Sequence, residues 1–338
     1  MAFPAVPSDG PVDDRGLFVV QDPELRARVL PLFRFDPRAP EQRPEGHGTA
    51  FRIDLWSRCL TAWHVVEDLL LAGPGDGMTL RLRDDMRLSA LQIGEQGYGR
   101  LPIPDGSWFP IREAYSLHRV EQRPFQPPVL RNLIELMVLR IRQRTHGEGT
   151  PFLPLDLSGW RPRVGERVLA LGYADLDRPR GQEDEDRPFR QHLWGSLAPI
   201  RHIEPANGER ARPWPLLRVD ADWPAGMSGG PVLNDAGHVI GVVSAGFKGE
   251  GGATATYFSG WDMPERILGS IDRSNPGRFH CYAVFDRDGE IAFCGQDTAE
   301  VERVAAERGL TRFGMVSVDP YSGEWMKGDG IGTLVRAG

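Results

Sequence analysis

The sequence predicts a mainly β protein, built as a barrel or a sandwich, and two observations support this fold class. From His47 onwards, short apolar runs are separated by glycine, proline and aspartate pairs at the spacing of β-hairpins. The composition agrees, because 40% of the 338 residues are hydrophobic and 26% are charged, which allows a sizeable core. The 40 glycines and 29 prolines indicate many turns but fall short of a low-complexity composition.

The first part of the chain, residues 1–45, contains prolines, scattered acidic residues and one apolar run, Arg28–Phe35. We expect one strand there, within an otherwise irregular arm. The strands of the main fold are predicted from the runs GTAFRI, RCLTAWHVV, MTLRLRDDMRLSALQI, IELMVLRI, RVLALGY, HLWGSLAPI, LLRVDAD and PVLNDAGHVIGVVSAG. The pairs Asp84-Asp85 and Asp235-Ala236-Gly237 lie between such runs and predict hairpin turns.

Two longer segments interrupt this pattern and are expected to be loops. Residues 97–128 carry aromatic residues and prolines, and residues 177–190 are strongly polar. Long loops on compact domains are often functional, so residues 97–128 are a candidate functional segment.

After a short helix expected at Met263–Leu268, the pattern changes. Residues Arg278–Cys294 predict a hairpin that turns at Asp286–Gly289. Thr298–Arg308 predicts an amphipathic helix and Arg312–Val318 a strand. The chain therefore is expected to end in a small α+β appendage.

Charge and cysteine content exclude several classes of protein. The formal net charge is −7 without a basic block, so we expect no nucleic-acid partner. No apolar stretch is long enough to span a membrane, and the first residues lack the pattern of a signal peptide, so a soluble, cytoplasmic protein is expected. Cys59, Cys281 and Cys294 form no CxxC motif and are expected to be reduced thiols. Histidines at metal-ligand spacing are missing, so neither a metal nor an organic cofactor is expected.

The segment Gly226-Met-Ser228-Gly-Gly-Pro231 is a candidate site for acyl transfer. A glycine-rich loop before a strand can expose a serine hydroxyl and aim backbone N–H groups at one point. The N–H groups of Gly226 and Ser228 could then bind the oxygen of a tetrahedral intermediate, as an oxyanion hole does. A glycine-rich turn that merely contains a serine is the alternative.

A second candidate is His64, which ends the buried run Leu60-Thr-Ala-Trp-His-Val-Val66. A general base requires a fixed and partly buried imidazole, and the small residues before His64 leave room for the ring. A histidine that is simply part of the core is the alternative.

Together these segments resemble the trypsin/chymotrypsin-fold serine proteases, in particular their bacterial, cytosolic or Deg-type branch. The resemblance covers about residues 29–270, in the family's order of histidine, acid and serine. It is carried by Gly48-Thr-Ala-Phe51, Leu60–Val66, Glu135-Leu-Met-Val-Leu-Arg-Ile141, Gly226–Val232 and Ile240–Gly246. It implies a chymotrypsin-like double six-stranded β-barrel. The expected domains are an arm (1–28), a barrel with His64 and Glu135 (29–150), a barrel with Ser228 (151–275) and the α+β appendage (276–338).

By this resemblance Ser228 is the nucleophile and His64 the base, without metal or organic cofactor. The third position departs from the family, because Glu135 stands where the family carries aspartate. A carboxylate one methylene longer can still accept the imidazole N–H, so Glu135 is expected to orient His64. Asp105 or another acid could serve instead, or the site could be degenerate.

The resemblance also predicts the substrate pocket, with walls formed by Asp222, Ser244, Ala245, Gly246 and Tyr257. Asp222 lies six residues before Ser228, where trypsin-like enzymes keep a carboxylate at the pocket floor. A buried carboxylate there would select arginine or lysine. Alternatively Asp220 matches an aspartate that Deg-type enzymes use structurally, and the pocket would accept small or aliphatic side chains.

The expected function is a trypsin-like serine endopeptidase that cleaves a protein substrate through an acyl-enzyme. The Ile-Val-Gly-Gly start of activated family members does not occur, so control is expected from the arm, residues 97–128, the appendage or a protein partner. The chain also resembles trypsin-like modules of bacterial conflict and antiviral defence systems. The main alternative is an inactive pseudoprotease that binds peptides or proteins. A Deg-type chaperone-protease is disfavoured, because its PDZ module is larger than the appendage.

Overall fold

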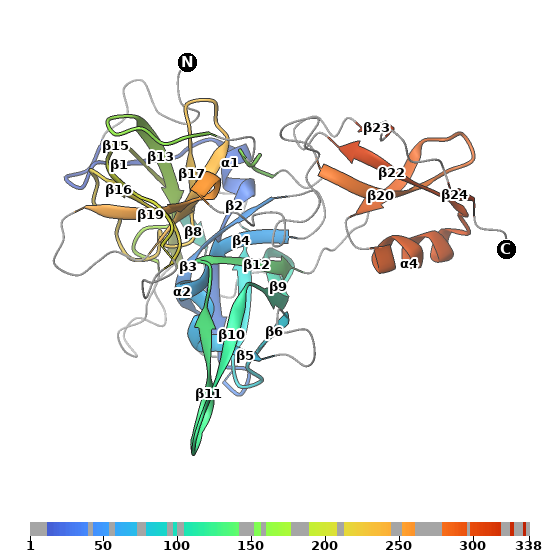
Figure 1. Cartoon of the computed structure of the whole chain (residues 1–338), viewed down its shortest axis with the longest axis horizontal. Coiled ribbons are helices and arrows are strands. Elements are labelled where there is room, and N and C mark those ends of the chain that lie inside the picture. Colours follow the sequence, from blue (N-terminus) through green and yellow to red (C-terminus); the bar gives the residue numbers. More distant parts are fainter. Residues whose placement is uncertain are drawn as a thin grey trace.

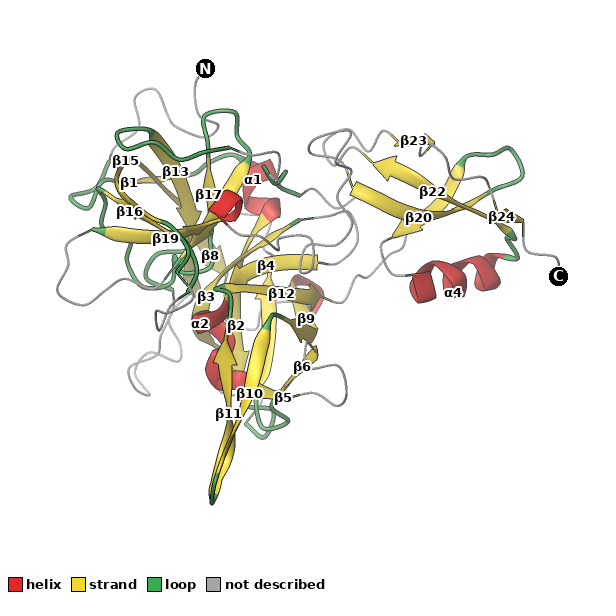
Figure 2. Ribbon diagram, in the orientation of Figure 1, coloured by secondary structure: helices red, strands yellow, loops and turns green. Residues whose placement is uncertain are grey.

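The chain forms two closed six-stranded antiparallel barrels followed by a smaller sheet (Figures 1 and 2). This confirms the predicted double β-barrel with an α+β appendage. The computed structural model describes residues 12–39, 43–53, 58–72, 79–92, 97–99, 105–141, 152–156, 160–176, 189–207, 213–244, 252–260, 279–295, 298–318, 325–327 and 334–335.

The first barrel has the strand order β12-β4-β3-β2-β7-β9 and is closed by the pairing of β12 with β9. Its strands are β2 (Val29–Phe35), β3 (Glu45–Arg52), β4 (Arg58–Ala62), β7 (Arg87–Leu91), β9 (Trp108–Tyr115) and β12 (Leu136–Ile141). Two short strands, β5 (Leu70–Ala72) and β6 (Thr79–Leu82), extend the sheet beyond β9. Its interior is filled by aliphatic side chains such as Leu30, Leu32 and Leu139, all fully buried.

The second barrel has the order β15-β13-β17-β18-β19-β16 and is closed by the pairing of β15 with β16. Its strands are β13 (Arg167–Gly172), β15 (Trp194–Glu204), β16 (Leu216–Val219), β17 (Pro231–Leu233), β18 (Val239–Val243) and β19 (Ala253–Tyr257). The arm adds β1 (Leu17–Val19) to the edge of β15. A further short pair joins β8 (Gly97–Gly99) to β14 (Phe189–Gln191).

The helices in the described part of the barrels are short. They are α1 (Pro23–Arg28), α2 (Trp63–Val66), and the 3-10 turns η1 (Glu67–Leu69), η2 (Asp105–Ser107) and η4 (Phe258–Gly260). Asp22 caps α1, because its Oδ1 accepts the N–H groups of Glu24 (2.8 Å) and Leu25 (3.4 Å). No helix in the described ranges has the length and apolar character that crossing a membrane requires.

A shared hydrophobic cluster joins the two barrels. It contains Phe33 and Phe51 from the first barrel and Leu171 and Val242 from the second, all essentially fully buried. Packing of this kind fixes one barrel against the other. Side chains at the junction can therefore be held in a defined relative position.

The prediction of a loop at residues 97–128 is wrong for most of this segment. Apart from η2 it contains β8, β9, β10 (His118–Arg123) and the start of β11 (Gln126–Asn132). Strands β10 and β11 pair only with each other, as a ribbon that projects from the first barrel (Figure 1). Their register shifts between Glu121 and Arg123, and Phe125 at the tip has a positive φ of 60°. Proline, which cannot complete a ladder, is tolerated in such edge strands.

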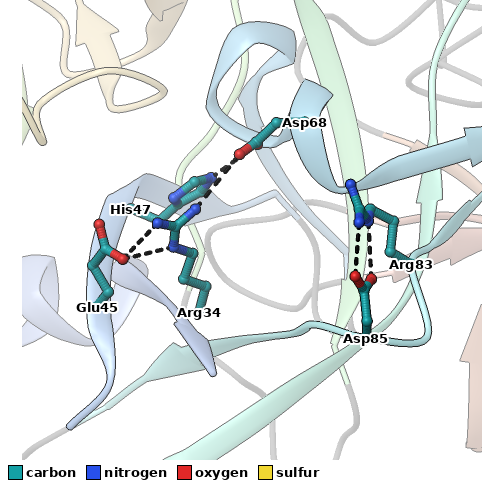
Figure 3. A network of polar contacts seen from close by, with 6 residues as sticks. All are labelled: Arg34, Glu45, His47, Asp68, Arg83 and Asp85. Atoms are coloured by element: carbon teal, nitrogen blue, oxygen red, sulfur yellow. Dashed lines mark hydrogen bonds and ion pairs between the residues drawn. The ribbon is translucent and has the colours of Figure 1, made fainter. Parts of the chain in front are cut away.

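Of the two predicted hairpin turns, one is correct. The turn at residues 235–237 joins the paired strands β17 and β18, and Gly237 has a φ of 82°. The turn at Asp84-Asp85 is closed by an ion pair of Arg83 with Asp85 (2.7 Å, Figure 3), but it does not make a hairpin. Strand β6 pairs with β5 and β9, and β7 pairs with β2 and β9, so β9 lies between them.

The appendage matches its prediction closely. It contains β20 (Phe279–Phe285), β21 (Ile291–Gly295), α4 (Thr298–Arg308), β22 (Arg312–Val318), β23 (Trp325–Lys327) and β24 (Leu334–Val335). Helix α4 buries Val301, Val304 and Ala305 against Val284 and Phe293 of the sheet. All three cysteines are free thiols. The helix predicted at 263–268 and most of the polar segment 177–190 lie outside the described residues.

Candidate active site

His64 lies where the register of two strands brings it beside Glu135. Strand β4 pairs with β12 so that Ala62 lies opposite Leu136. The two chain segments meet again just beyond the sheet, because the N–H of Trp63 donates to the carbonyl of Glu135 (3.1 Å). The carboxylate of Glu135 contacts Nδ1 of His64. The imidazole is about a quarter exposed and the carboxylate is buried, with side-chain exposures of 24% and 3%.

The helix that carries His64 is tied to the barrel by an ion-pair network around Asp68 of η1 (Figure 3). Arg34 of β2 donates from Nε and Nη2 to Oε2 of Glu45 at 2.8 and 2.6 Å. Its Nη1 lies 3.6 Å from Oδ2 of Asp68, and Nε2 of His47 lies 3.5 Å from Oδ1 of Asp68. Because η1 follows α2 directly, these contacts hold α2 against β2 and β3.

Glu135 is held by three side chains. Its Oε1 faces His64 and accepts a hydrogen bond from Oγ of Ser244 (3.3 Å), and its Oε2 accepts one from Nδ2 of Asn132 (3.2 Å). The amide of Asn132 is itself oriented, because its Oδ1 accepts the N–H of Ile134 (2.8 Å). A buried carboxylate requires such partners, and here each oxygen has one. The longer side chain of glutamate therefore has a fixed position next to the imidazole.

Ser228 lies in a loop that we call the serine loop, residues 225–230. Its side chain is half-buried, whereas Met227 before it is fully buried in the second barrel. Every backbone carbonyl from residue 225 to 228 accepts a hydrogen bond. The donors, in that order, are the N–H of Asp175 (2.9 Å), the hydroxyl of Thr49 (2.6 Å), the N–H of Gly230 (3.0 Å) and the N–H of Thr49 (2.9 Å).

The amides of the serine loop divide into two groups. Those of Met227, Gly229 and Gly230 donate to backbone carbonyls at 2.9–3.2 Å. No hydrogen bond of the described residues uses the N–H of Gly226 or Ser228. These are the two groups predicted to form the oxyanion hole. The same part of the chain shows no hydrogen bond between the Ser228 hydroxyl and His64; such contacts often tighten only when substrate binds.

Thr49 connects the serine loop to the first barrel. Its hydroxyl donates to Gly226 and accepts the N–H of Tyr173 (3.0 Å), while its own carbonyl accepts the hydroxyl of Thr61 (2.7 Å). Thr49 and Thr61 are fully buried. Burial also raises the pKa of Tyr173, whose hydroxyl donates to Val29 (3.0 Å), so this tyrosine stays neutral. The serine loop is therefore fixed from both barrels.

Gly229 is required by this close approach. It has a φ of 84°, and an added Cβ would lie 2.1 Å from Oγ1 of Thr61 and 2.3 Å from the carbonyl oxygen of Thr49. Gly229→Ala is expected to lower the free energy of unfolding by about 2–5 kcal/mol, the sum of backbone strain and overpacking. The control is Gly165→Ala, at a φ of 87° with nothing within 4 Å, where only about 1–2 kcal/mol is expected. Equal losses in urea denaturation would show that the contact with Thr49 and Thr61 is unimportant.

The predicted pocket residues are only partly brought together. Ser244 lies beside Glu135, a role that the sequence did not indicate. Tyr257 is buried at the end of β19, and burial raises its pKa. Asp222 is exposed, in contrast to the buried carboxylate expected at a pocket floor, and Asp220 pairs with Arg201 at the surface. Ala245 and Gly246 lie outside the described residues.

The acid next to His64 is Glu135, one of the alternatives left open by the sequence; the side chain of Asp105 lies outside the described part. Sequence reasoning missed Asn132 and Thr49. A signal existed for Asn132, which lies three residues before Glu135 at the end of a strand. Thr49 lies in the run Gly48–Phe51 that carries the resemblance, but no local signal indicates its role, since the two partners of its hydroxyl are more than 120 residues away.

Two closed six-stranded barrels in this arrangement define a chymotrypsin-like fold. A family model described as the trypsin-like peptidase domain matches residues 48–242, more than half of the chain. The chain belongs to this family of trypsin-like peptidases. A comparison with curated proteins found no match.

Solved structures include similar chains at low identity. Deg5 is 18% identical, with a TM-score of 0.38 over 69% of this chain and 85% of its own. The active form of the Rv3671c protease from M. tuberculosis is 17% identical, with a TM-score of 0.41 over 80% of this chain and 93% of its own. The inactive form of the Rv3671c protease is 16% identical, with a TM-score of 0.40 over 78% of this chain and 100% of its own.

Proposed function

We propose that this protein is a serine endopeptidase with Ser228 as nucleophile, His64 as general base and Glu135 as the acid that orients His64. The observation that carries the proposal is the contact of the buried Glu135 carboxylate with Nδ1 of His64. Because Nδ1 faces Glu135, the lone pair of Nε2 points away from the acid. It can then accept a proton from a serine hydroxyl. The N–H groups of Gly226 and Ser228, which donate to no other group of the described residues, supply the second requirement, a place for the oxyanion.

The mechanism follows from these positions. Oγ of Ser228 attacks the scissile carbonyl while Nε2 of His64 takes its proton, and Glu135 stabilises the imidazolium that forms. The negative oxygen of the tetrahedral intermediate accepts hydrogen bonds from Gly226 and Ser228. His64 then gives the proton to the leaving amine. Water, activated by the same imidazole, releases the acyl group and restores the serine.

The alternative of an inactive binding module rested on the departure at Glu135. Contacts from His64, Asn132 and Ser244 to this carboxylate favour catalysis over that alternative. The direct test is to incubate the purified protein with an unfolded, carboxymethylated protein and to identify fragments by mass spectrometry. Wild type and the control Ser107→Ala are expected to produce the same fragments, and Ser228→Ala none. A wild-type protein that binds this substrate without cutting it would support the pseudoprotease.

The partners of Glu135 provide a graded prediction. Asn132→Ala removes one charge-assisted hydrogen bond and is expected to lower kcat/KM about 10-fold. Asn132→Asp is expected to cost about 100-fold, because a second carboxylate would then lie beside Glu135 and repel it. Peptide hydrolysis across this pair of variants checks the order. Equal losses would mean that Asn132 acts only through packing.

Specificity, control and biological setting stay predictions. Cleavage after arginine or lysine is expected if Asp222 faces the substrate, and the fragments of the test above report the residue before each cut. Substituting Asp222 with alanine should then abolish a basic preference without preventing cleavage. Control by a protein partner or by the appendage and a cytoplasmic location rest on the sequence pattern, and a role in bacterial antiviral defence rests on the resemblance alone.

A further inference from the structure

The direction of the Gly226 N–H is set by a residue outside the serine loop. In a trans peptide the carbonyl and the following N–H lie in one plane and point in opposite directions. The carbonyl of Ala225 is held by the N–H of Asp175 at 2.9 Å, so this hydrogen bond also fixes where the Gly226 N–H points. Gly226 itself has a φ of 98°, and a Cβ there would lie 2.4 Å from the carbonyl oxygen of Tyr173. The turn at residues 173–176 and the serine loop are therefore in direct backbone contact.

Asp175 holds this position at a conformational cost. Its φ of 54° is in the left-handed region, which costs a residue other than glycine free energy, although aspartate tolerates it better than most. A second interaction that keeps Asp175 in place therefore helps to keep its N–H directed at Ala225. That interaction is an ion pair with the arm, in which Nη1 of Arg15 donates to Oδ2 of Asp175 at 2.7 Å.

Arg15 is presented to Asp175 by a structured turn of the arm. The carboxylate of Asp13 accepts the N–H groups of Arg15 (3.0 Å) and Leu17 (2.8 Å), and also Nε of Arg15 (3.0 Å). Leu17 is fully buried in the second barrel and pairs with Ser196 of β15. Arg15 is thus anchored on both sides, and its side chain is only 29% exposed.

Asp13 and Arg15 keep their charges at neutral pH. Burial would raise the pKa of Asp13, but hydrogen bonds from Leu17 and Arg15 outweigh it and lower that pKa. The hydrogen bond to Asp175 raises the pKa of Arg15. A carboxyl group with a lowered pKa stabilises the folded turn above its unfolded pKa and loses this contribution as the pH falls through the folded value. The arm is therefore expected to stay attached at neutral pH.

We propose that Arg15 is a positioning residue for the oxyanion hole: through Asp175 and the carbonyl of Ala225, it holds the Gly226 N–H toward the substrate oxygen. The inference rests on the proposed function and adds to it a part of the chain outside the matched family segment, 48–242. Asp175 is 63% exposed, so the coupling is modest and sensitive to salt. Loss of the ion pair is expected to slow acylation about two- to fivefold.

The test compares Arg15→Met, Asp175→Asn and the double variant, with Asp14→Asn as a control. Met keeps much of the length of the Arg15 stem, Asn keeps the tolerance of a positive φ, and Asp14 is an exposed neighbour of Arg15. The readouts are the rate of labelling by a fluorophosphonate probe and the hydrogen exchange rate of the Asp175 amide. Both single variants are expected to label about two- to fivefold more slowly at low salt, with no further loss in the double variant.

In Arg15→Met the Asp175 amide is expected to exchange faster, while the pH profile of labelling is unchanged because His64 is not involved. High salt should slow the labelling of wild type toward the rate of Arg15→Met. The labelling rate of Arg15→Met should itself change little with salt. Labelling and exchange rates equal to wild type in Arg15→Met, or strictly additive losses, would overturn the proposal. If the wild type does not label at all, the proposed function fails. The exchange of the Asp175 amide still decides the link, since unchanged exchange in Arg15→Met refutes it and faster exchange supports it.

Discussion

Alanine at either Ser228 or His64 is expected to lower kcat about 10⁶-fold, and the double variant is expected to lose no more. The nucleophile and its base act as one unit, so removing either leaves only the contribution of the oxyanion hole and of binding. The measurement is the rate of peptide hydrolysis. The background rate is that of wild-type protein whose active site has been blocked. Neither change should unfold the protein, because the His64 imidazole and the Ser228 side chain are both partly exposed.

Additive losses in that double variant would contradict the proposed mechanism, because they would mean that the two residues contribute independently. A His64→Ala variant that retains most of its activity would have the same consequence. It would place the general base elsewhere.

The second large effect is expected at Glu135. Glu135→Gln keeps the size of the side chain but presents an amide to His64, which favours the wrong tautomer and is expected to cost about 10⁴-fold in kcat. Glu135→Asp restores the residue usual in the family. It nevertheless withdraws the carboxylate by about 1.5 Å from partners placed for glutamate, and a misplacement of this size is expected to cost about 10²-fold.

Hydrolysis rates of the two Glu135 variants, together with their urea denaturation curves, separate catalysis from stability. An aspartate variant as active as wild type would show that the site is not built around the longer side chain. A glutamine variant with full activity would remove Glu135 from the mechanism altogether.

Helix α4 shows where local signals decide the structure, because the sequence predicted its bounds to the residue. Helix α4 (Thr298–Arg308) is amphipathic and is followed by Gly309 at a φ of 64°, a common way for a helix to end. Strand β1 could not be predicted, because three residues of strand form only by pairing with β15, about 175 positions further on. The ribbon β10–β11 could not be predicted either, because Pro127 and Pro128 favour a turn, and proline is tolerated within a strand mainly at a sheet edge.

The candidate site also has residues that a local sequence pattern indicates and residues that only the folded chain reveals. His64, Ser228 and Glu135 could be proposed from the sequence because each lies in a short segment with a family pattern. The residues that fix their geometry come from other segments. Thr49 and Ser244 lie in runs that carry the family resemblance, but nothing local indicates which groups they contact. Thr49 holds the serine loop through its hydroxyl and N–H, and Ser244 reaches Glu135 from the second barrel. Only the assembled barrels bring these groups together.

The most direct test of the account is to react the protein with a fluorophosphonate and to locate the adduct by mass spectrometry. The probe phosphonylates a serine oxygen and releases fluoride, and only an activated serine reacts at a useful rate. We expect one adduct, on the peptide that contains Ser228, with labelling lost in His64→Ala and strongly slowed in Glu135→Gln. An adduct on any other residue, or labelling of Ser228 that does not depend on His64, would contradict the proposal that these three residues form the active site.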